Sequence, residues 1–198
     1  MNVSQHPNLR LRFRAPDTRL AGTIRYSIGR CIYGALLVAR NSDGICAIFI
    51  GDGYEALHEQ LVDAFPPLQY ALIQSDLDSD LLKVSEFVRD PECKVVLDIS
   101  IGGTNFQQRV WKMLTEIPAG QTRSYAQVAQ QIGVPGAVRA VASACAANVL
   151  AIAIPCHRVV RSDGTISGYR RGPERKRDIL RSESILSANA KNSNLIPA

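Results

Sequence analysis

Hydrophobic and polar positions follow two different periods in the first half of the chain. Three short runs rich in β-branched and aromatic residues, separated by turn signals such as Asn-Ser-Asp-Gly, predict successive antiparallel strands. These runs cover residues 23–29, 34–40 and 44–51. Apolar residues then recur at helical spacing over 54–65 and 78–88, and the first of these stretches places Leu57, Leu61, Val62 and Phe65 on one face. The pattern predicts a small α/β unit.

The second half is predominantly helical in pattern. Residues 95–100 form a strand or a linker into it, and Thr104 caps a stretch whose apolar residues Phe106, Val110, Trp111 and Leu114 share one stripe. Two stretches at 124–133 and 137–148, joined by Val-Pro-Gly, are a helix-turn-helix candidate. A last helix begins at Pro173 and places Ile179 and Glu183 on one side.

These patterns predict two domains. We expect an α/β N-terminal domain at residues 1–95, with a small antiparallel sheet and helices. A mostly α-helical C-terminal domain follows at 96–198, with the helix-turn-helix and a flexible tail from about residue 186. The chain has 198 residues, of which 46% are hydrophobic, and this is enough for one sizeable core or two small ones.

Charge distinguishes the two halves. Residues 1–99 carry 10 Lys and Arg against 13 Asp and Glu, whereas residues 100–198 carry 13 against 5. This basic excess favours a polyanionic partner such as DNA, with a solvated surface as the alternative. No apolar run approaches the roughly 20 residues of a membrane helix, and no cleavable leader pattern is present, so we expect a cytoplasmic protein without a membrane partner.

Cysteine usage points to a single reactive thiol. The five cysteines are widely spaced without a Cys-x-x-Cys pair, which predicts reduced thiols and no metal site. Cys31, Cys46, Cys93 and Cys145 are expected to be inert core residues. Cys156 differs, because Pro155 fixes the backbone before it and His157 and Arg158 follow it. A histidine acting as base and a nearby cation increase the availability of a thiolate.

The stretch 137–148 has an unusual surface for a DNA-reading helix. Almost all its side chains are small, including Ala140 and Ser143, and Arg139 is its one long polar residue. Tight packing against another helix explains this composition. The alternative is a helix that enters the minor groove, with Arg139 as a probe of the base stack, and such a protein would bind DNA with little sequence preference.

Four strings together resemble a known family. They are Ile-Pro-Cys-His-Arg-Val-Val at 154–160, the stretches 124–133 and 137–148, and the basic segment 167–183. They resemble the methylated-DNA–protein-cysteine methyltransferases (O6-alkylguanine-DNA alkyltransferases), most closely the C-terminal alkyltransferase half of bacterial Ada. The resemblance is specific from Leu97 to Glu183 and weaker through the first half, for which it implies an RNase H-like fold.

The resemblance implies a single-turnover repair reaction. An alkyl group would pass from O6-alkylguanine, or O4-alkylthymine, in duplex DNA to Cys156 after minor-groove binding and nucleotide flipping. His157 would act as base through a water, with Glu183 orienting it and Asn148 forming a left-handed turn before Cys156. The implied DNA contacts are Tyr125, Arg139, Ala140 and Ser143. The implied base pocket consists of Pro155, Ser167, Gly168, Tyr169 and Arg170; some relatives have serine in place of Arg170.

The resemblance further implies a monomer that needs no cofactor and no metal, with alkylated double-stranded DNA as its partner. The chain would be either a stand-alone repair protein or part of a longer Ada-like regulator. Three alternatives are a non-catalytic damage sensor, which Cys156 argues against, a transcriptional regulator of the Ada kind, which would need a further N-terminal DNA-binding region, and a Cys-His hydrolase, which would release product repeatedly.

Overall fold

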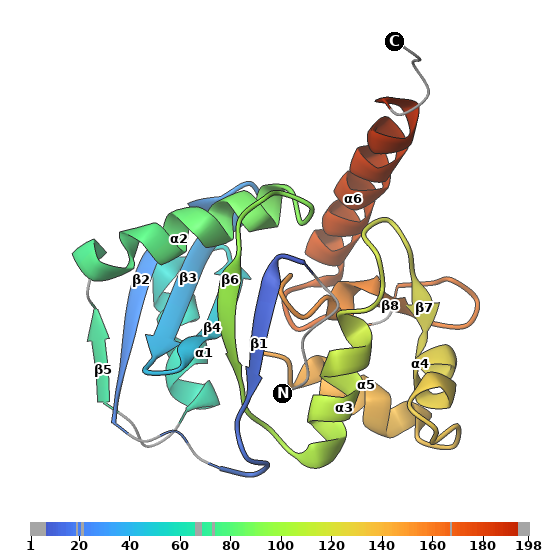
Figure 1. Cartoon of the computed structure of the whole chain (residues 1–198), viewed down its shortest axis with the longest axis horizontal. Helices are drawn as coiled ribbons and strands as arrows, with labels where there is room; N and C mark the ends of the chain where they lie inside the picture. The colour runs from blue at the N-terminus through green and yellow to red at the C-terminus, as the bar shows by residue number, and fades with distance from the viewer. Residues whose placement is uncertain are drawn as a thin grey trace.

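A mixed β-sheet forms the first half of the molecule (Figure 1). The computed structural model describes residues 7–18, 20, 22–65, 69–72, 74–166 and 168–193. Within these ranges the sheet has six strands in the order β1-β6-β4-β3-β2-β5. The strands are β1 (Leu9–Phe13), β2 (Thr23–Cys31), β3 (Gly34–Asn41), β4 (Gly44–Gly51), β5 (Gln69–Leu72) and β6 (Leu97–Ile101).

Strand direction confirms part of the prediction and corrects the rest. Strands β2, β3 and β4 form the predicted antiparallel meander. The pairs β1–β6, β4–β6 and β2–β5 are parallel, so the expectation of a small antiparallel sheet is wrong. Tight turns indicate antiparallel neighbours in a sequence, whereas parallel neighbours are joined by long crossovers that leave no local signal.

The sheet also extends beyond the expected boundary at residue 95. Strand β6, expected as a strand or linker into the second half, pairs with both β1 and β4. A division into domains at 1–95 and 96–198, and an RNase H-like topology, stay predictions.

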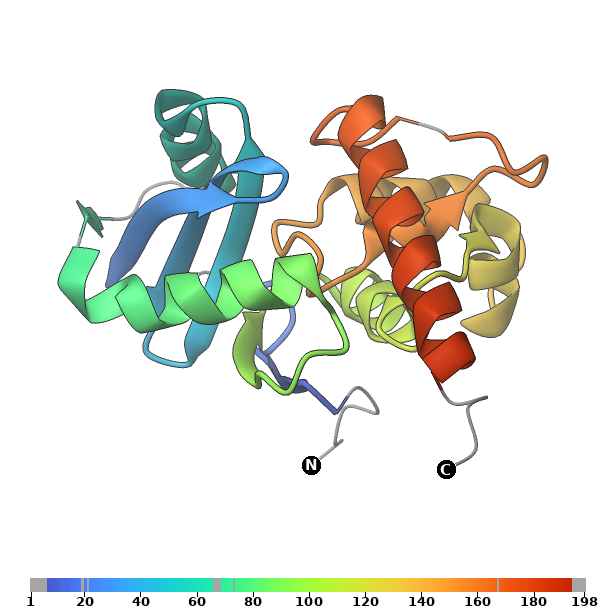
Figure 2. The ribbon, with the colours of Figure 1, turned by 90° about the horizontal axis from the view of Figure 1, so that it is seen from above.

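Two helices cover opposite faces of the sheet (Figure 2). On one face, Leu57 and Leu61 of α1 (Tyr54–Ala64) are buried with Phe49 of β4. On the other, α2 (Gln74–Arg89) contributes Val84 and Phe87 to a core that continues into the second half. Val62, which the pattern placed on the buried face of its helix, is exposed. Burial on both faces explains why the central strands are nearly continuous apolar runs.

The second half consists mainly of helices beside this sheet (Figure 2). Its elements are α3 (Asn105–Leu114), β7 (Arg123–Ser124), α4 (Tyr125–Gln131), α5 (Val138–Ala146), the 3-10 helix η1 (Cys156–Arg158), β8 (Val159–Val160) and α6 (Pro173–Ser193). Helices α4 and α5 contact each other, and their assignment as a helix-turn-helix stays a prediction. Over the described ranges, none of the helices is both long and apolar enough to cross a membrane.

The last helix is longer than predicted. The sequence predicts a tail from about residue 186, whereas α6 continues to Ser193 and its last turns project from the body (Figure 1); the flexibility of this part stays a prediction. The hydroxyl of Ser187 donates a hydrogen bond to the carbonyl of Ala119 at 3.0 Å, which attaches this part of the helix to the loop after α3. The Ser-, Ala- and Asn-rich sequence has little amphipathic pattern, so this tertiary contact left no signal in it.

A Thr104→Ala variant is expected to lose about 1 kcal/mol of unfolding free energy, because Thr104 is a helix cap. Its hydroxyl accepts a hydrogen bond from the Gln107 amide at 3.2 Å, and the Gln107 side chain accepts one from the Thr104 amide at 3.0 Å. Urea denaturation measures the difference. Thr18→Ala, at an exposed position, is the control; equal losses in both variants would contradict the role of the cap.

Candidate active site

Cys156 lies in a stretch of chain in which every residue from 151 to 160 is buried. This segment leaves α5, runs beside β4 and turns through η1 into β8. The residue is 3% exposed, and its Sγ accepts a hydrogen bond from Nδ2 of Asn148 at 3.1 Å. A substrate atom therefore has to enter the protein to reach this thiol.

Asn148 holds the irregular segment together through its side chain. Besides Cys156, its Nδ2 donates to the carbonyl of Ile154 at 2.8 Å, and its Oδ1 accepts from the amide of Leu150 at 2.8 Å. The predicted left-handed turn at Asn148 is wrong, because the residue with positive φ is Ile152, at 64°. Irregular buried backbone needs hydrogen-bond partners outside regular ladders, and the asparagine amide supplies both a donor and an acceptor.

His157, Arg158 and Glu183 form a buried hydrogen-bonded group. Nε2 of His157 lies 2.9 Å from Oε1 of Glu183. Arg158 donates to both carboxylate oxygens, from Nη2 to Oε1 at 2.7 Å and from Nε to Oε2 at 2.9 Å, and its Nη1 donates to the carbonyl of Ile117 at 2.5 Å. All three residues are at most 2% exposed. The structure thus brings His157 and Glu183 together as the resemblance implies.

Protonation in this group follows from its contacts. Burial alone would raise the pKa of Glu183, but His157 and Arg158 outweigh it and lower this pKa to about 2. Burial lowers the pKa of His157 from its ordinary 6.5, although Glu183 partly opposes this. At pH 7 the carboxylate is therefore charged, with Arg158 as its counter-ion, and the imidazole is neutral. Because Nε2 faces the carboxylate, the proton lies on Nε2 and Nδ1 is the basic nitrogen.

Nδ1 of His157 is buried and has no hydrogen-bond partner among the described residues. A buried lone pair without a partner is unfavourable, so an unused basic nitrogen at this position calls for an explanation. Its position next to Cys156 in the chain makes it a candidate proton acceptor for the thiol.

Glu183 occupies the middle of α6 instead of its C-terminus. The sequence placed it near a helix end, where the helix dipole would call for a positive partner. Because α6 continues to Ser193, that argument is wrong. A positive partner is nevertheless present, since Arg158 comes from a distant part of the chain and compensates the carboxylate directly.

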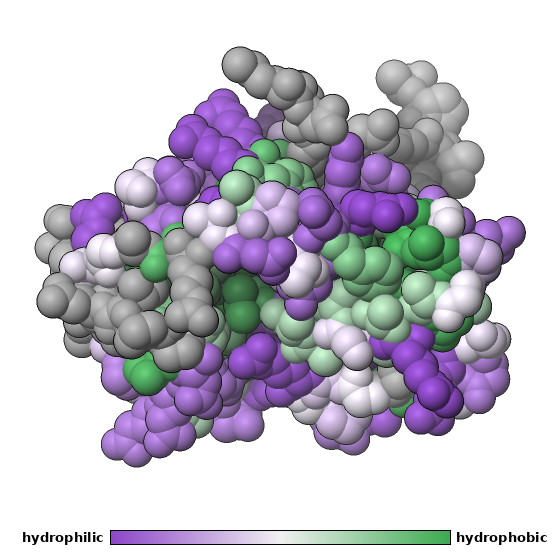
Figure 3. Space-filling model, turned by 90° about the horizontal axis from the view of Figure 1, so that it is seen from below, coloured by the Kyte–Doolittle hydropathy of each residue, from purple (hydrophilic) through white to green (hydrophobic). Residues whose placement is uncertain are grey.

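Helices α4 and α5 form a surface that a short pair of strands links to the segment of Cys156. Strand β7, immediately before Tyr125, pairs in parallel with β8, immediately after η1. On α5, Val141, Ala144 and Cys145 are buried, and the indole of Trp111 donates to the carbonyl of Ala144 at 2.9 Å. The other face exposes Arg139, Ala140 and Ser143, so α5 packs by one side and leaves the small-residue side open. Figure 3 shows weakly hydrophobic surface on this half of the molecule.

Comparison with known proteins decides the family. The profile of "6-O-methylguanine DNA methyltransferase, DNA binding domain" matches residues 105–185. The chain is 47% identical over 172 residues to the "Bifunctional transcriptional activator/DNA repair enzyme Ada" of Escherichia coli, covering 87% of this chain and 48% of that protein. It is 32% identical to the structure of Mycobacterium tuberculosis OGT in complex with DNA, with a TM-score of 0.65, covering 81% of this chain and 93% of that one. The chain belongs to the O6-methylguanine–DNA methyltransferase family.

The Ada protein and a shorter methyltransferase match different lengths of this chain. A methylated-DNA–protein-cysteine methyltransferase of Mycobacterium bovis is 52% identical over 87 residues, or 44% of this chain and 53% of that protein. The chain thus spans about half the length of the curated relatives it matches.

The residues that the resemblance assigns to a base pocket have different environments. Pro155 is buried beside Cys156, and Tyr169 is half-buried with its ring 5.9 Å from Nζ of Lys176. Gly168 and Arg170 are exposed, and the Arg170 guanidinium lies 5.9 Å from the ring of Phe49 on β4, which is a contact with the sheet. Ser167 lies outside the described residues.

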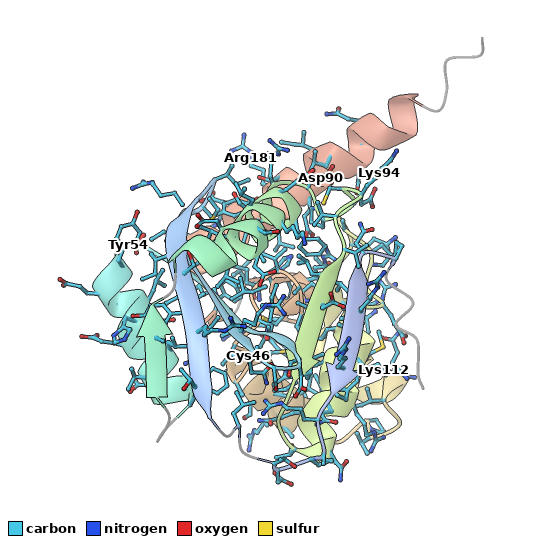
Figure 4. All side chains as sticks on the ribbon, turned by 60° about the vertical axis from the view of Figure 1, so that its left-hand side comes forward. Cys46, Tyr54, Asp90, Lys94, Lys112 and Arg181 are labelled. Carbon is cyan, nitrogen blue, oxygen red and sulfur yellow. The ribbon has the colours of Figure 1, made fainter. Side chains whose placement is uncertain are left out.

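The other cysteines of this methyltransferase-family chain have environments unsuited to a nucleophile. Burial raises the pKa of Cys46 to about 12 and raises that of Cys145 as well. Cys46 lies inside the sheet half (Figure 4). Burial is also the main cause that raises the pKa values of Cys31 and Cys93. All four thiols are therefore protonated at pH 7, as expected for inert core residues.

Lys176, which the sequence pattern did not single out, is fully buried on α6. Its Nζ donates to the carbonyl of Val159 at 2.5 Å. Burial lowers the pKa of this amine, and the neighbouring Cys156 and Cys145 partly oppose the shift. The available signal was spacing, because Lys176, Ile179 and Glu183 lie at helical intervals on one face, and a lysine within a buried stripe is unusual.

Proposed function

We propose that this protein repairs DNA by transferring the alkyl group of O6-alkylguanine, or of O4-alkylthymine, from duplex DNA to Cys156. The observation that carries the proposal is the neutral, buried His157, whose Nε2 is fixed by Glu183 and whose Nδ1 is unused. In the reaction the Sγ–carbon bond forms while the carbon–O6 bond breaks. The thiol proton passes through a water to Nδ1, and the protonated imidazole then returns a proton to the departing guanine, so that the products are the thioether and neutral guanine.

The product explains why each molecule reacts once. A thioether at Cys156 has no good leaving group, and the other thiols are kept protonated by burial. Asn148 supports the thiol by donating to Sγ, which stabilises negative charge that develops there. Regeneration would need a further nucleophile, so the protein is consumed as a reagent. No cofactor is needed for this transfer.

Access to a buried thiol requires the damaged nucleotide to leave the duplex. We assign the exposed face of α5 to the minor groove, where Ala140 and Ser143 allow close approach of the helix. Arg139 then fills the space that the base leaves, and Tyr125, at the start of α4, rotates the phosphate. The exposure of these α5 residues supports the assignment.

The base is received by Pro155, Ser167, Gly168, Tyr169 and Arg170. A helix-turn-helix, a monomeric state and a cytoplasmic location stay predictions.

The proposal is tested by incubating the protein with duplex DNA that contains O6-methylguanine and locating the methyl group by peptide mass spectrometry. One methyl group is expected on Cys156 and none on Cys145, and Cys156→Ser should accept none. Methylation at another residue, or no methylation of folded protein, would contradict the proposal. Repeated release of product from an ester or peptide would instead favour a Cys-His hydrolase.

Arg139→Ala is expected to slow transfer from duplex DNA by about tenfold or more, because the flipped state loses the side chain that replaces the base. Transfer from the free O6-methylguanine base should be unchanged, since no flipping is needed. Single-turnover rates on both substrates measure the effect. Arg89→Ala, an exposed arginine on α2, removes the same charge from the other half and serves as control. Equal slowing on both substrates would exclude the arginine-finger role.

A further inference from the structure

The segment that carries Cys156 is docked on the open edge of strand β4. The amide of Ile48 donates to the carbonyl of Val149 at 2.9 Å, and the amide of Ala151 donates to the carbonyl of Ile48 at 3.0 Å. Strand β6 pairs with β4 only at Ile45, so near Ile48 this edge is available to the segment. Strand β4 of the sheet therefore holds, by backbone hydrogen bonds, the segment that leads to the thiol.

Arg171 connects strand β4 to the backbone of Asn148. Its Nη2 donates to the carbonyls of Ile48 and Asn148, each at 3.3 Å. The residue is 5% exposed, and its Nε and Nη1 have no hydrogen-bond partner in the part of the chain that the structure describes. Burying a guanidinium without a carboxylate is unfavourable, and its compensation among the described residues is the two carbonyls and the ring of Tyr169, 5.7 Å from Cζ.

Arg175, in the first turn of α6, supports Arg171, which lies just before that helix. Its Nη1 donates to the carbonyl of Arg171 at 2.5 Å, its Nε to the carbonyl of Tyr33 at 3.1 Å, and its Nη2 to Asp52 at 2.6 Å. Tyr33 lies in the turn between β2 and β3, and Asp52 follows β4. We call Arg171 and Arg175 the arginine clamp. Through it, three segments of the sheet half are joined to the backbone behind the thiol.

We propose that Arg171 is a positioning residue for Cys156, which fixes the nucleophile by joining strand β4 to the backbone of Asn148. Asn148 is the link, since its carbonyl accepts from Arg171 while its side chain donates to Sγ. A shift of the Asn148 backbone would move Nδ2 relative to Sγ. The inference rests on the proposed function, and it gives the sheet half a part in the transfer reaction.

The test compares single-turnover methyl transfer from O6-methylguanine duplex with affinity for unmodified duplex. Arg171→Met is expected to transfer about tenfold more slowly, as expected for loss of a charged donor, with its affinity for DNA unchanged. Arg171→Lys, which keeps the charge and a donor, should recover most of the rate. Arg181→Met removes an equal charge from an exposed position on α6, the helix that follows Arg171 (Figure 4), and should transfer at the parent rate.

A second measurement follows the NMR signal of the Asn148 side-chain amide. It should shift in Arg171→Met, return in Arg171→Lys and stay unchanged in Arg181→Met. Should Arg171→Met fail to fold, Asp52→Asn decides, because Asp52 is exposed and its loss weakens the support of Arg175. That variant should shift the same signal and transfer about threefold more slowly.

The outcomes are distinguishable. A folded Arg171→Met protein with the parent rate, or a slower rate explained by an equal loss of DNA affinity, overturns the positioning role. An unchanged transfer rate and an unchanged Asn148 signal in Asp52→Asn also overturn the positioning role. Absence of transfer by the parent protein refutes the proposed function instead, and the Asn148 signal then still decides whether Arg171 controls the geometry of Asn148.

Discussion

A Glu183→Gln variant is expected to unfold with about 3 kcal/mol less free energy than the parent, because removing one partner of a buried ion pair leaves the other charge uncompensated. Arg158 makes three hydrogen bonds to this carboxylate at 3.2 Å or less and is 2% exposed, so it cannot turn to solvent without opening the core. Urea denaturation measures the loss.

The same substitution is expected to slow methyl transfer by about 100-fold or more, which is the usual contribution of a positioned base. The carboxylate accepts a hydrogen bond from Nε2 of His157 and so keeps the proton on that nitrogen. A neutral amide can donate as well as accept, and it no longer enforces that tautomer. Single-turnover kinetics on the free base isolate this step from DNA binding.

Glu174→Gln is the matched control for both measurements. It removes a carboxylate from the same helix, but Glu174 is exposed and pairs with Arg177 on the surface. Exposed pairs contribute at most about 1 kcal/mol, so its stability and rate should stay close to those of the parent. Similar behaviour of the Glu174 and Glu183 variants would contradict the role assigned to the buried group.

Acid is expected to destabilise the protein in two stages. Both Glu183 and His157 have folded-state pKa values below their ordinary ones, so the unfolded chain binds more protons and stability falls as the pH falls. The contribution of His157 is complete above its ordinary 6.5 and is lost below it. That of Glu183 is complete above 4.5 and is lost as the pH falls towards about 2; it amounts to about 3 kcal/mol.

Activity should follow the first of these stages. His157 should be neutral at pH 7. The acid limb of the pH–rate profile for transfer from the free base should therefore lie below pH 6.5. Unfolding free energies measured from pH 8 to pH 3 test the stability prediction, with Glu183→Gln losing the lower stage. A rate that already declines between pH 8 and pH 7 with the shape of a titrating imidazole would contradict the assigned protonation.

Local pattern was sufficient for much of the fold. The meander of β2, β3 and β4, the helix α1 and the capped α3 were predicted because their turns, periodicity and caps lie within a few residues of one another. The parallel strands β1 and β5 and the length of α6 were not, because they depend on partners far away in the chain.

The sequence by itself determined the candidate chemistry: the string around Cys156 and its resemblance name the thiol, the histidine and the glutamate. Tertiary structure alone decided how they function. The counter-ion of Glu183, the unused nitrogen of His157 and the contact of Arg171 with Asn148 all join distant segments in a dry interior. Charge compensation and burial depend on distance in space, which local sequence does not encode.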